Sequence, residues 1–286
     1  MNISNERVSS LAVGTAWLGG FKVERKFYAT IKDLDRKQRL LKFWINALKS
    51  IFEDSKVVID LAQMYGSGFT DIAVGEVIKD FERNDLFLVW KSDIQDFADL
   101  RLCVENALYS LGVDSVDLLM PHKKVDPSLL SNAIAAMKDL QGKGLIKYYG
   151  FGHATRQMLE QAEEIEPQPA VCSTTKAIQN SASIHVGLKY IPNGLIEYCK
   201  ARNITIMAYS PVGRVIKDGV ALERIERVRD INDYGHCTNA QIATAWSLNK
   251  GFLPICGSQN REHIKELLES TKIGLSQYAM EILDGN

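Results

Sequence analysis

The chain of 286 residues lacks three features that would assign it to a specialised class. No apolar run approaches the roughly 18–20 residues that a membrane span needs, so we expect no membrane partner. Neither sign of charge dominates, because 34 Lys and Arg face 35 Asp and Glu, whereas a nucleic-acid binder usually carries a basic excess. The first residues form no basic stretch followed by an apolar core, so we expect no signal peptide and a cytoplasmic protein.

Cysteines are few, and segments typical of interdomain linkers are absent from the sequence. The five cysteines are an odd number, and no Cys-x-x-Cys pair or close Cys/His pairing indicates a metal site. We therefore expect reduced, mostly packed thiols and no bound metal. No Pro/Gly/Ser-rich linker or low-complexity tract divides the chain. Residues 1–286 are therefore expected to form a single domain, with residues 272–286 as a short C-terminal closing helix and tail.

The chain does contain a repeating alternation of short apolar runs and amphipathic segments. Eight runs begin near residues 11, 57, 86, 116, 146, 170, 204 and 252, and several are continuously apolar, as in strands buried on both faces. Between residues 97 and 111, apolar residues recur at steps of 3, 4, 4 and 3, which is helical spacing. One βα unit takes about 30 residues, and from the second to the fifth run each run begins 29 or 30 residues after the one before it. Eight such units predict an α/β fold, a single-domain (β/α)8 or TIM barrel.

Four polar residues stand where the predicted strands end, which is where such barrels place their chemistry. Asp60 ends the second strand, and Tyr65 follows it by five residues. Lys91 ends the third strand, and His122 follows the fourth. Each alone has an ordinary structural explanation, such as a helix cap, a turn residue or a rim charge. Because neighbouring strands lie about 4.8 Å apart, the four together predict one catalytic group.

The predicted group suits proton transfer to a carbonyl oxygen. A phenol holds its proton at neutral pH, since its ordinary pKa is near 10. We expect the Lys91 ammonium, held in place by Asp60, to lower the pKa of Tyr65 and so to make it a proton donor and, in reverse, an acceptor. His122 would hydrogen-bond the same oxygen and orient the substrate. The group has no electron source, so hydride must come from a bound cofactor.

Several segments in sequence order resemble those of the aldo-keto reductase superfamily. They are Lys91 and residues 60–66 (DLAQMYG), 117–122 (DLLMPH), 142–147 (GKGLIK), 208–213 (AYSPVG) and 240–246 (AQIATAW), and they cover nearly the whole chain. The resemblance implies a barrel that binds NADPH or NADH without a Rossmann fold. It also implies reversible reduction of a small-molecule aldehyde, ketone or sugar carbonyl. The implied catalytic residues are Tyr65, Lys91, Asp60 and His122.

The same resemblance implies a nucleotide site along the strand ends. Tyr209 would stack on the nicotinamide ring, and the residues after it would line the pyrophosphate path. The full set of implied cofactor-binding residues is Gly14, Thr15, Ala16, Trp17, Asp60, His153, Ser173, Tyr209, Ser210, Pro211, Val212, Gly213, Arg214, Gly257, Ser258, Gln259, Arg261 and His263.

The chain departs from the family pattern at both ends of this site. Gly152 and His153 stand where family members usually place Ser-Asn, and Ser173 is expected where a strand-six Gln is usual. NADP-dependent members place basic residues at the adenine end, because a 2′-phosphate needs charge-assisted partners, but this chain offers Gln259 and His263 there. The usual preference of the family favours NADP (NADPH) over NAD as the cofactor, and the use of both nucleotides stays open.

Two other classes of function stay open. The departures at Gly152, His153 and Ser173 affect residues that hold the nicotinamide in family members. They are compatible with a nucleotide-binding regulatory or interaction protein of the same fold that turns over little substrate. Lys91 could instead act covalently as a Schiff-base amine in another barrel enzyme, such as a sugar isomerase or aldolase. No coiled-coil seam demands a dimer, so we expect a monomer or a weak homo-oligomer.

Overall fold

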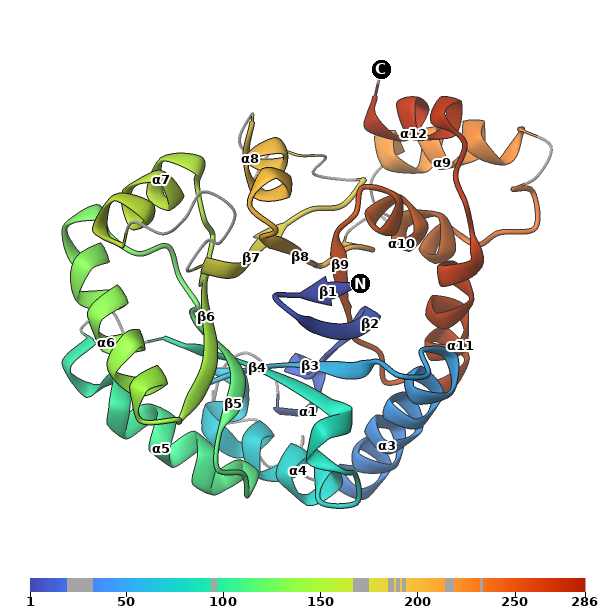
Figure 1. The fold of residues 1–286 in the computed structure, drawn as a ribbon. Coiled ribbons are helices and arrows are strands. Elements are labelled where there is room, and N and C mark those ends of the chain that lie inside the picture. The colour runs from blue at the N-terminus through green and yellow to red at the C-terminus, as the bar shows by residue number, and fades with distance from the viewer. Residues whose placement is uncertain are drawn as a thin grey trace.

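Eight parallel strands close into a barrel that helices surround, as expected from the sequence (Figure 1). The barrel closes because β2 pairs with β3 on one side and with β9 on the other. The strands are β2 (Glu6–Gly14), β3 (Lys56–Ala62), β4 (Leu86–Ser92), β5 (Val116–Pro121), β6 (Ile146–Gly152), β7 (Thr175–Ser181), β8 (Thr205–Tyr209) and β9 (Leu253–Cys256). This computed structural model describes residues 1–19, 33–93, 97–166, 175–184, 188, 191, 194–213, 219–231 and 234–285.

The helices form where apolar residues recur at steps of three and four. In α3 (Leu34–Ile51), for example, Leu41, Trp44 and Leu48 are all buried against the sheet. Thr238 caps the start of α10 (Asn239–Asn249) with a capping box, in which its hydroxyl accepts from the backbone N–H of Gln241. The other helices are α1 (Ala16–Gly19), α4 (Phe69–Ile78), α5 (Leu100–Leu111), α6 (Leu130–Gly142), α7 (Arg156–Ile165), α8 (Leu195–Ala201), α9 (Gly219–Arg229), α10 (Asn239–Asn249), α11 (Arg261–Glu269) and α12 (Gln277–Asp284).

Seven of the eight predicted barrel strands are confirmed, and the sixth was placed wrongly. The apolar run at residues 170–172 lies outside the described residues, and β7, at 175–181, is the strand that pairs with β6 and β8. Most residues of β7 are polar (TKAIQNS), so it gives no apolar run. Because this strand was misplaced, the sequence analysis did not identify Gln179, which points into the barrel.

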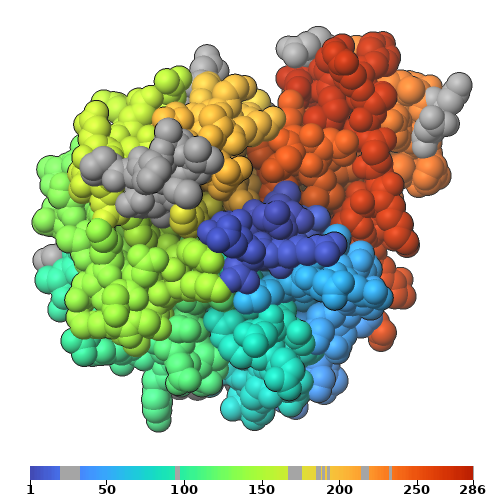
Figure 2. Space-filling model, viewed as in Figure 1, coloured from blue at the N-terminus to red at the C-terminus, as the bar shows by residue number. Residues whose placement is uncertain are grey.

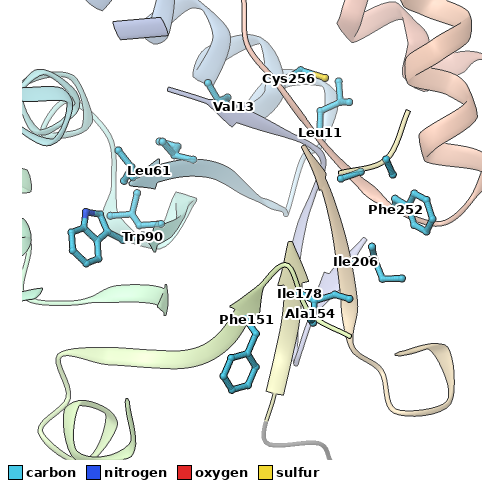
Figure 3. Packing of buried hydrophobic residues seen from close by; sticks show 14 of the residues in the cluster. Leu11, Val13, Leu61, Trp90, Phe151, Ala154, Ile178, Ile206, Phe252 and Cys256 are labelled. Atoms are coloured by element: carbon cyan, nitrogen blue, oxygen red, sulfur yellow. The ribbon is translucent and has the colours of Figure 1, made fainter. Parts of the chain in front are cut away.

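Alternation along the strands sorts the apolar side chains into two layers. In β3, Val57 and Ile59 face the surrounding helices, whereas Val58 faces the lumen with Phe87 and Met207. Figure 3 shows outward-facing members of the larger layer, on strands around the barrel: Leu11, Val13, Leu61, Trp90, Phe151, Ile178, Ile206 and Cys256. The same alternation turns the polar residues near the strand ends inward.

A short hairpin closes the amino end of the barrel. Strand β1 (Asn2–Ile3) pairs antiparallel with the start of β2, and Ile3 is fully buried among the lumen side chains. The Thr205 hydroxyl on β8 donates to the Asn2 carbonyl at 2.8 Å, which ties the hairpin to a strand that does not pair with β2. Figure 2 shows these residues covering the centre of that face. Access to the lumen is therefore left to the carboxyl ends of the strands.

The cysteines agree with the expectation of reduced, mostly packed thiols. All four in the described part of the chain are free, and Cys199, Cys237 and Cys256 are buried. Across the described ranges, no helix combines the length and apolar character that crossing a bilayer requires.

Close strand contact makes Gly150 on β6 a sensitive position. A Cβ there would lie 2.1 Å from the Ala177 carbonyl oxygen of β7. We expect Gly150→Ala to lower the free energy of unfolding by about 2–3 kcal/mol or more, because backbone cannot move aside as a side chain can. Urea unfolding measures the change. Gly142→Ala, at the end of α6 where a Cβ meets nothing within 4 Å, is the matched control and should stay within about 1 kcal/mol of wild type.

Asp71 of α4 is a carboxyl held inside the helix layer. Its side chain accepts a 3.1 Å hydrogen bond from the Trp90 indole through Oδ2. The other oxygen, Oδ1, is buried and has no hydrogen-bond partner among the described residues. Burial raises the pKa of this carboxyl to about 7, although the Trp90 bond opposes the shift. The folded protein thus keeps a proton that the unfolded chain releases at lower pH.

The raised pKa of the Asp71 carboxyl predicts that the stability of the protein depends on pH. The unfolded carboxyl ionises near its ordinary value of 3.8, so the folded state is progressively disfavoured as the pH rises from there through 7. Measured against Asp71→Asn, the wild-type free energy of unfolding should fall by up to about 4 kcal/mol between about pH 4 and pH 8. Urea titrations of both proteins across that range test it. A difference that does not vary with pH would contradict the buried neutral acid.

Candidate functional site

A cavity of about 810 Å³ opens at the carboxyl ends of the barrel strands. Its volume lies within the roughly 300–1,000 Å³ that ligand pockets occupy. The lining residues come from most of the barrel strands, the segments that follow them, and three helices. They are Gly14, Ala16, Trp17, Lys37, Asp60, Tyr65, His122, His153, Gln179, Tyr209, Ser210, Pro211, Val212, Gly213, Ile255, Cys256, Gly257, Gln259 and Leu267.

A buried ion pair forms the floor of one end of this cavity. The Lys91 ammonium donates to Asp60 Oδ1 at 2.5 Å, and Gln179 Nε2 donates to the same oxygen at 2.8 Å. Lys91 is fully buried, and Asp60 is 2% exposed. Burial lowers the pKa of Lys91, and the Asp60 carboxylate opposes that shift. Each charge therefore depends on the other, because neither is in contact with bulk water.

Tyr65 reaches this pair from a sharp turn after β3. The turn is a 3-10 helix (Tyr65–Gly68), in which Gly66 has a φ of 59° and Ser67 a φ of 51°. The Lys91 nitrogen lies 5.1 Å from the Tyr65 ring centroid, and the phenol hydrogen-bonds the Asp60 carboxylate. The residues expected to act together are therefore in contact.

The expected lowering of the Tyr65 pKa is wrong for the protein without ligand. Burial raises the pKa of the phenol first, and the negative charges of Asp60 and Asp93 raise it further. The Lys91 charge cannot overcome them, because Asp60 already neutralises it at 2.5 Å. Tyr65 thus holds its proton firmly, as a donor must before reaction.

His122 completes the group and has a partner that the sequence analysis missed. Its ring lies edge-on to Tyr65, with 5.9 Å between the ring centroids. His122 Nδ1 lies 2.9 Å from Asp93 Oδ1, and neither atom has a hydrogen-bond partner elsewhere in the described residues. Asp93 comes directly after β4, and its backbone N–H donates to the Gln63 side chain at 3.0 Å. Its position past a strand end was the signal available in the sequence.

Gln179 of β7 supplies the strand-six glutamine that the sequence analysis considered absent. Alternation along β7 places Ala177 and Gln179 in the lumen, with Ile178 facing outward. The residue expected in its place, Ser173, lies outside the described part of the chain. A glutamine is therefore present on the sixth barrel strand, where the sequence analysis expected none.

The turn after β6 has a backbone that its neighbours hold in a strained form. His153 has a φ of 51°, in the left-handed region that few side chains favour. Its N–H donates to the Gln179 carbonyl at 2.9 Å, and Asn180 Oδ1 accepts from Ala154 N–H at 3.1 Å. A Cβ on Gly152 would lie 2.6 Å from the Pro121 carbonyl oxygen, so only glycine fits there. This turn sets the His153 ring 5.6 Å from the Tyr209 ring.

Most of the other expected site residues lie on the cavity wall, and a few do not. Lys91 lies behind Asp60, and Thr15 is buried beneath the floor, where its hydroxyl donates to the Asp60 carbonyl at 2.7 Å. Ser258, Arg261 and His263 do not line the cavity, and Arg214 is outside the described residues. The lining residues that the sequence analysis missed are Lys37, Gln179, Ile255, Cys256 and Leu267.

The rest of the wall is formed by backbone, aromatic rings and few polar side chains. Ser210 and Gly213 both have left-handed backbone, with φ of 54° and 48°, so the segment after β8 curls around the cavity. Gly257 brings backbone close to Trp17, because a Cβ there would lie 3.0 Å from the indole ring. The buried Trp17 Nε1 has no hydrogen-bond partner within the described ranges. This wall offers accessible backbone, aromatic rings and the unpaired Trp17 N–H donor. These groups suit a long polar ligand with an aromatic end.

Comparisons with known proteins agree with this architecture. The sequence matches the Aldo/keto reductase family over residues 38–285. It is 25% identical to the methylglyoxal reductase YeaE of Escherichia coli, over 87% of this chain and 86% of that protein. The crystal structure of the thermostable aldo-keto reductase Tm1743 in complex with the inhibitor epalrestat has a TM-score of 0.82, at 30% identity over 99% of this chain and 96% of that one. An aldo/keto reductase from Klebsiella pneumoniae in complex with NADP and acetate shares the fold, with a TM-score of 0.76 at 22% identity over 97% and 91%.

The buried pair predicts a coupled effect on stability. Lys91→Met leaves the Asp60 carboxylate without its cation, so we expect the free energy of unfolding to fall by about 3 kcal/mol or more. The double variant Asp60→Asn/Lys91→Met buries no charge and should recover at least about half of that loss. Urea unfolding of the wild type, Asp60→Asn, Lys91→Met and the double variant gives the four free energies of this double-mutant cycle. Losses that simply add would contradict the coupling.

Proposed function

This chain belongs to the aldo/keto reductase family, and from that premise we propose that it is an NAD(P)H-dependent oxidoreductase that reversibly reduces an aldehyde, ketone or sugar carbonyl to the alcohol. The observation that carries the proposal is the convergence of Tyr65, Asp60 and His122 on one end of the cavity, with Lys91 directly behind them. The same cavity, of about 810 Å³, extends to Gln259.

The nucleotide would lie along the wall from Tyr209 to Gln259. A reduced nicotinamide supplies the hydride that no protein side chain can provide. Tyr209 and His153 present aromatic rings beside the nicotinamide end, and Gln179 offers an amide there. The curled segment from Ser210 to Gly213 would follow the pyrophosphate, because its backbone can approach a ligand closely.

Tyr65 would hold and transfer the proton. Its phenol, kept protonated by burial and by neighbouring negative charge, donates from Oη to the carbonyl oxygen during reduction. Lys91 lies 5.1 Å from the Tyr65 ring and would stabilise the phenolate that the transfer leaves. Asp60 fixes the ammonium in place at 2.5 Å. In the alcohol-to-carbonyl direction the same phenolate accepts the proton back.

His122 would orient the substrate. With Nδ1 2.9 Å from the Asp93 carboxylate, the ring presents Nε2 for a hydrogen bond with the carbonyl oxygen. Asp93 thereby acts as a positioning residue that fixes the ring.

A covalent role for Lys91 has less support than the reductase proposal. The amine is fully buried, and its Nζ is held at 2.5 Å by Asp60. A Schiff-base amine must reach the substrate carbon in neutral form, so both features oppose that role. A regulatory protein with little turnover is separated from the enzyme by the assay below.

The proposal predicts that Tyr65→Phe lowers kcat/KM for carbonyl reduction by about 10²–10⁴-fold, because a positioned general acid contributes that much. Nucleotide affinity should stay within about threefold, since the ring remains. NADPH oxidation with methylglyoxal, an aliphatic aldehyde and an aldose measures turnover, and fluorescence titration measures binding.

Tyr148→Phe is the control for the loss of a phenol elsewhere. Tyr148 packs on Phe87, with ring centroids 6.5 Å apart, and does not line the cavity. Its variant should keep wild-type turnover. Undiminished turnover in Tyr65→Phe would overturn the acid role. A wild-type protein that binds NADPH but reduces no carbonyl would favour the regulatory class.

A further inference from the structure

Lys37 of α3 is a buried cation that the proposed chemistry does not use. The residue is 6% exposed and lines the cavity. Its ammonium donates one hydrogen bond, to the Leu18 carbonyl at 3.0 Å. Among the described residues no carboxylate lies within ion-pair distance of it. An ammonium has three donors, so Lys37 can still offer two hydrogen bonds and its full charge to a ligand.

Two more cations stand at the same end of the cavity. Helix α3 lies beside α11 (Figure 1), and the Arg36 guanidinium donates to the Gln259 carbonyl at 3.3 Å. The Arg261 guanidinium at the start of α11 lies 4.1 Å over the Phe43 ring of α3. Neither arginine forms an ion pair within the described ranges, and the nearby Glu262 is bound to Lys265 at 3.0 Å. This junction of α3 and α11 therefore carries three cations without an ion-pair partner among the described residues, although the charge of Asp33 acts on Lys37 from beyond ion-pair distance.

The ligand that suits this junction is a compact anion on a nucleotide. The cavity wall beside Lys37 includes Gln259 and Leu267, whose side chains carry no charge. A phosphate monoester carries a charge of about −1.5 to −2 at neutral pH and offers three acceptor oxygens. A buried lysine with spare donors would gain most from such a group, because burial weakens its hold on its own proton.

We propose that Lys37, assisted by Arg36, binds the 2′-phosphate of NADP, so that α3 supplies the charge that Gln259 lacks. The proposal rests on the nucleotide site of the proposed function. It makes α3, which contributes nothing to the chemistry at Tyr65, the source of NADP preference. Lys37 is here a specificity-determining residue, since it would touch the part of the cofactor that NAD does not have.

Fluorescence titration of the full chain with NADPH and with NADH tests this directly. Lys37→Gln should raise the Kd for NADPH about tenfold or more, because it removes a charge-assisted hydrogen bond, and should leave the Kd for NADH within about twofold. Arg36→Gln, at an exposed position that should tolerate the change, should raise the Kd for NADPH alone by about threefold. The matched control is Lys42→Gln on the same helix, where the lysine is exposed and pairs with Asp80 at 2.9 Å; neither Kd should change.

The outcomes separate this proposal from the one on which it rests. 2′,5′-ADP should displace NADPH from the wild type more strongly than 5′-ADP does, and Lys37→Gln should abolish the difference. Equal losses of NADPH and NADH binding in Lys37→Gln would mean a structural or pyrophosphate role and would overturn the proposal, as would no loss of either. Equal wild-type affinity for the two nucleotides would overturn it and leave the reductase proposal standing. Binding of neither nucleotide would overturn both.

Discussion

The alternation of side chains along parallel strands is the constraint on which the rest of this structure depends. Because the barrel is closed, every second residue must fit the lumen, and the innermost positions take apolar side chains such as Val58, Phe87 and Met207. Nearer the carboxyl ends the inward positions are polar. Asp60, Lys91 and Gln179 occupy such positions on three strands, so the sheet itself brings them within hydrogen-bond distance. The site is a consequence of strand register.

The electrostatics of that layer follow from burial. Asp60 accepts from Lys91 and from Gln179 and also hydrogen-bonds Tyr65, so one carboxylate organises three side chains. Burial and the negative charges of Asp60 and Asp93 all raise the pKa of Tyr65, which explains why the proximity of Lys91 does not acidify the phenol. A positively charged ligand beside the phenol would change that balance, because in a low dielectric each added charge has a large effect.

Much of the fold and the central site could be predicted from the sequence, and the failures have physical causes. Continuous apolar runs mark buried parallel strands, which is why β3, β4 and β5 were found. Strand β7 was missed because its lumen positions carry Gln179 and its neighbours are polar, so its burial leaves no apolar run. Lys37 was missed for a different reason. A lysine on an amphipathic helix normally faces solvent, but this one is buried where α3 packs against α11, and it donates to the Leu18 carbonyl of α1.

The hairpin at the amino end gives the barrel two faces with separate duties. Ile3 seals one end with side-chain packing, and the opposite end carries the cavity that Tyr65, His122 and Tyr209 line. The closing contacts and the reactive groups therefore lie at opposite ends of the barrel and use different residues. Residues around the open end can therefore be substituted during evolution and accept new ligands, while the packed amino end preserves the barrel that positions them.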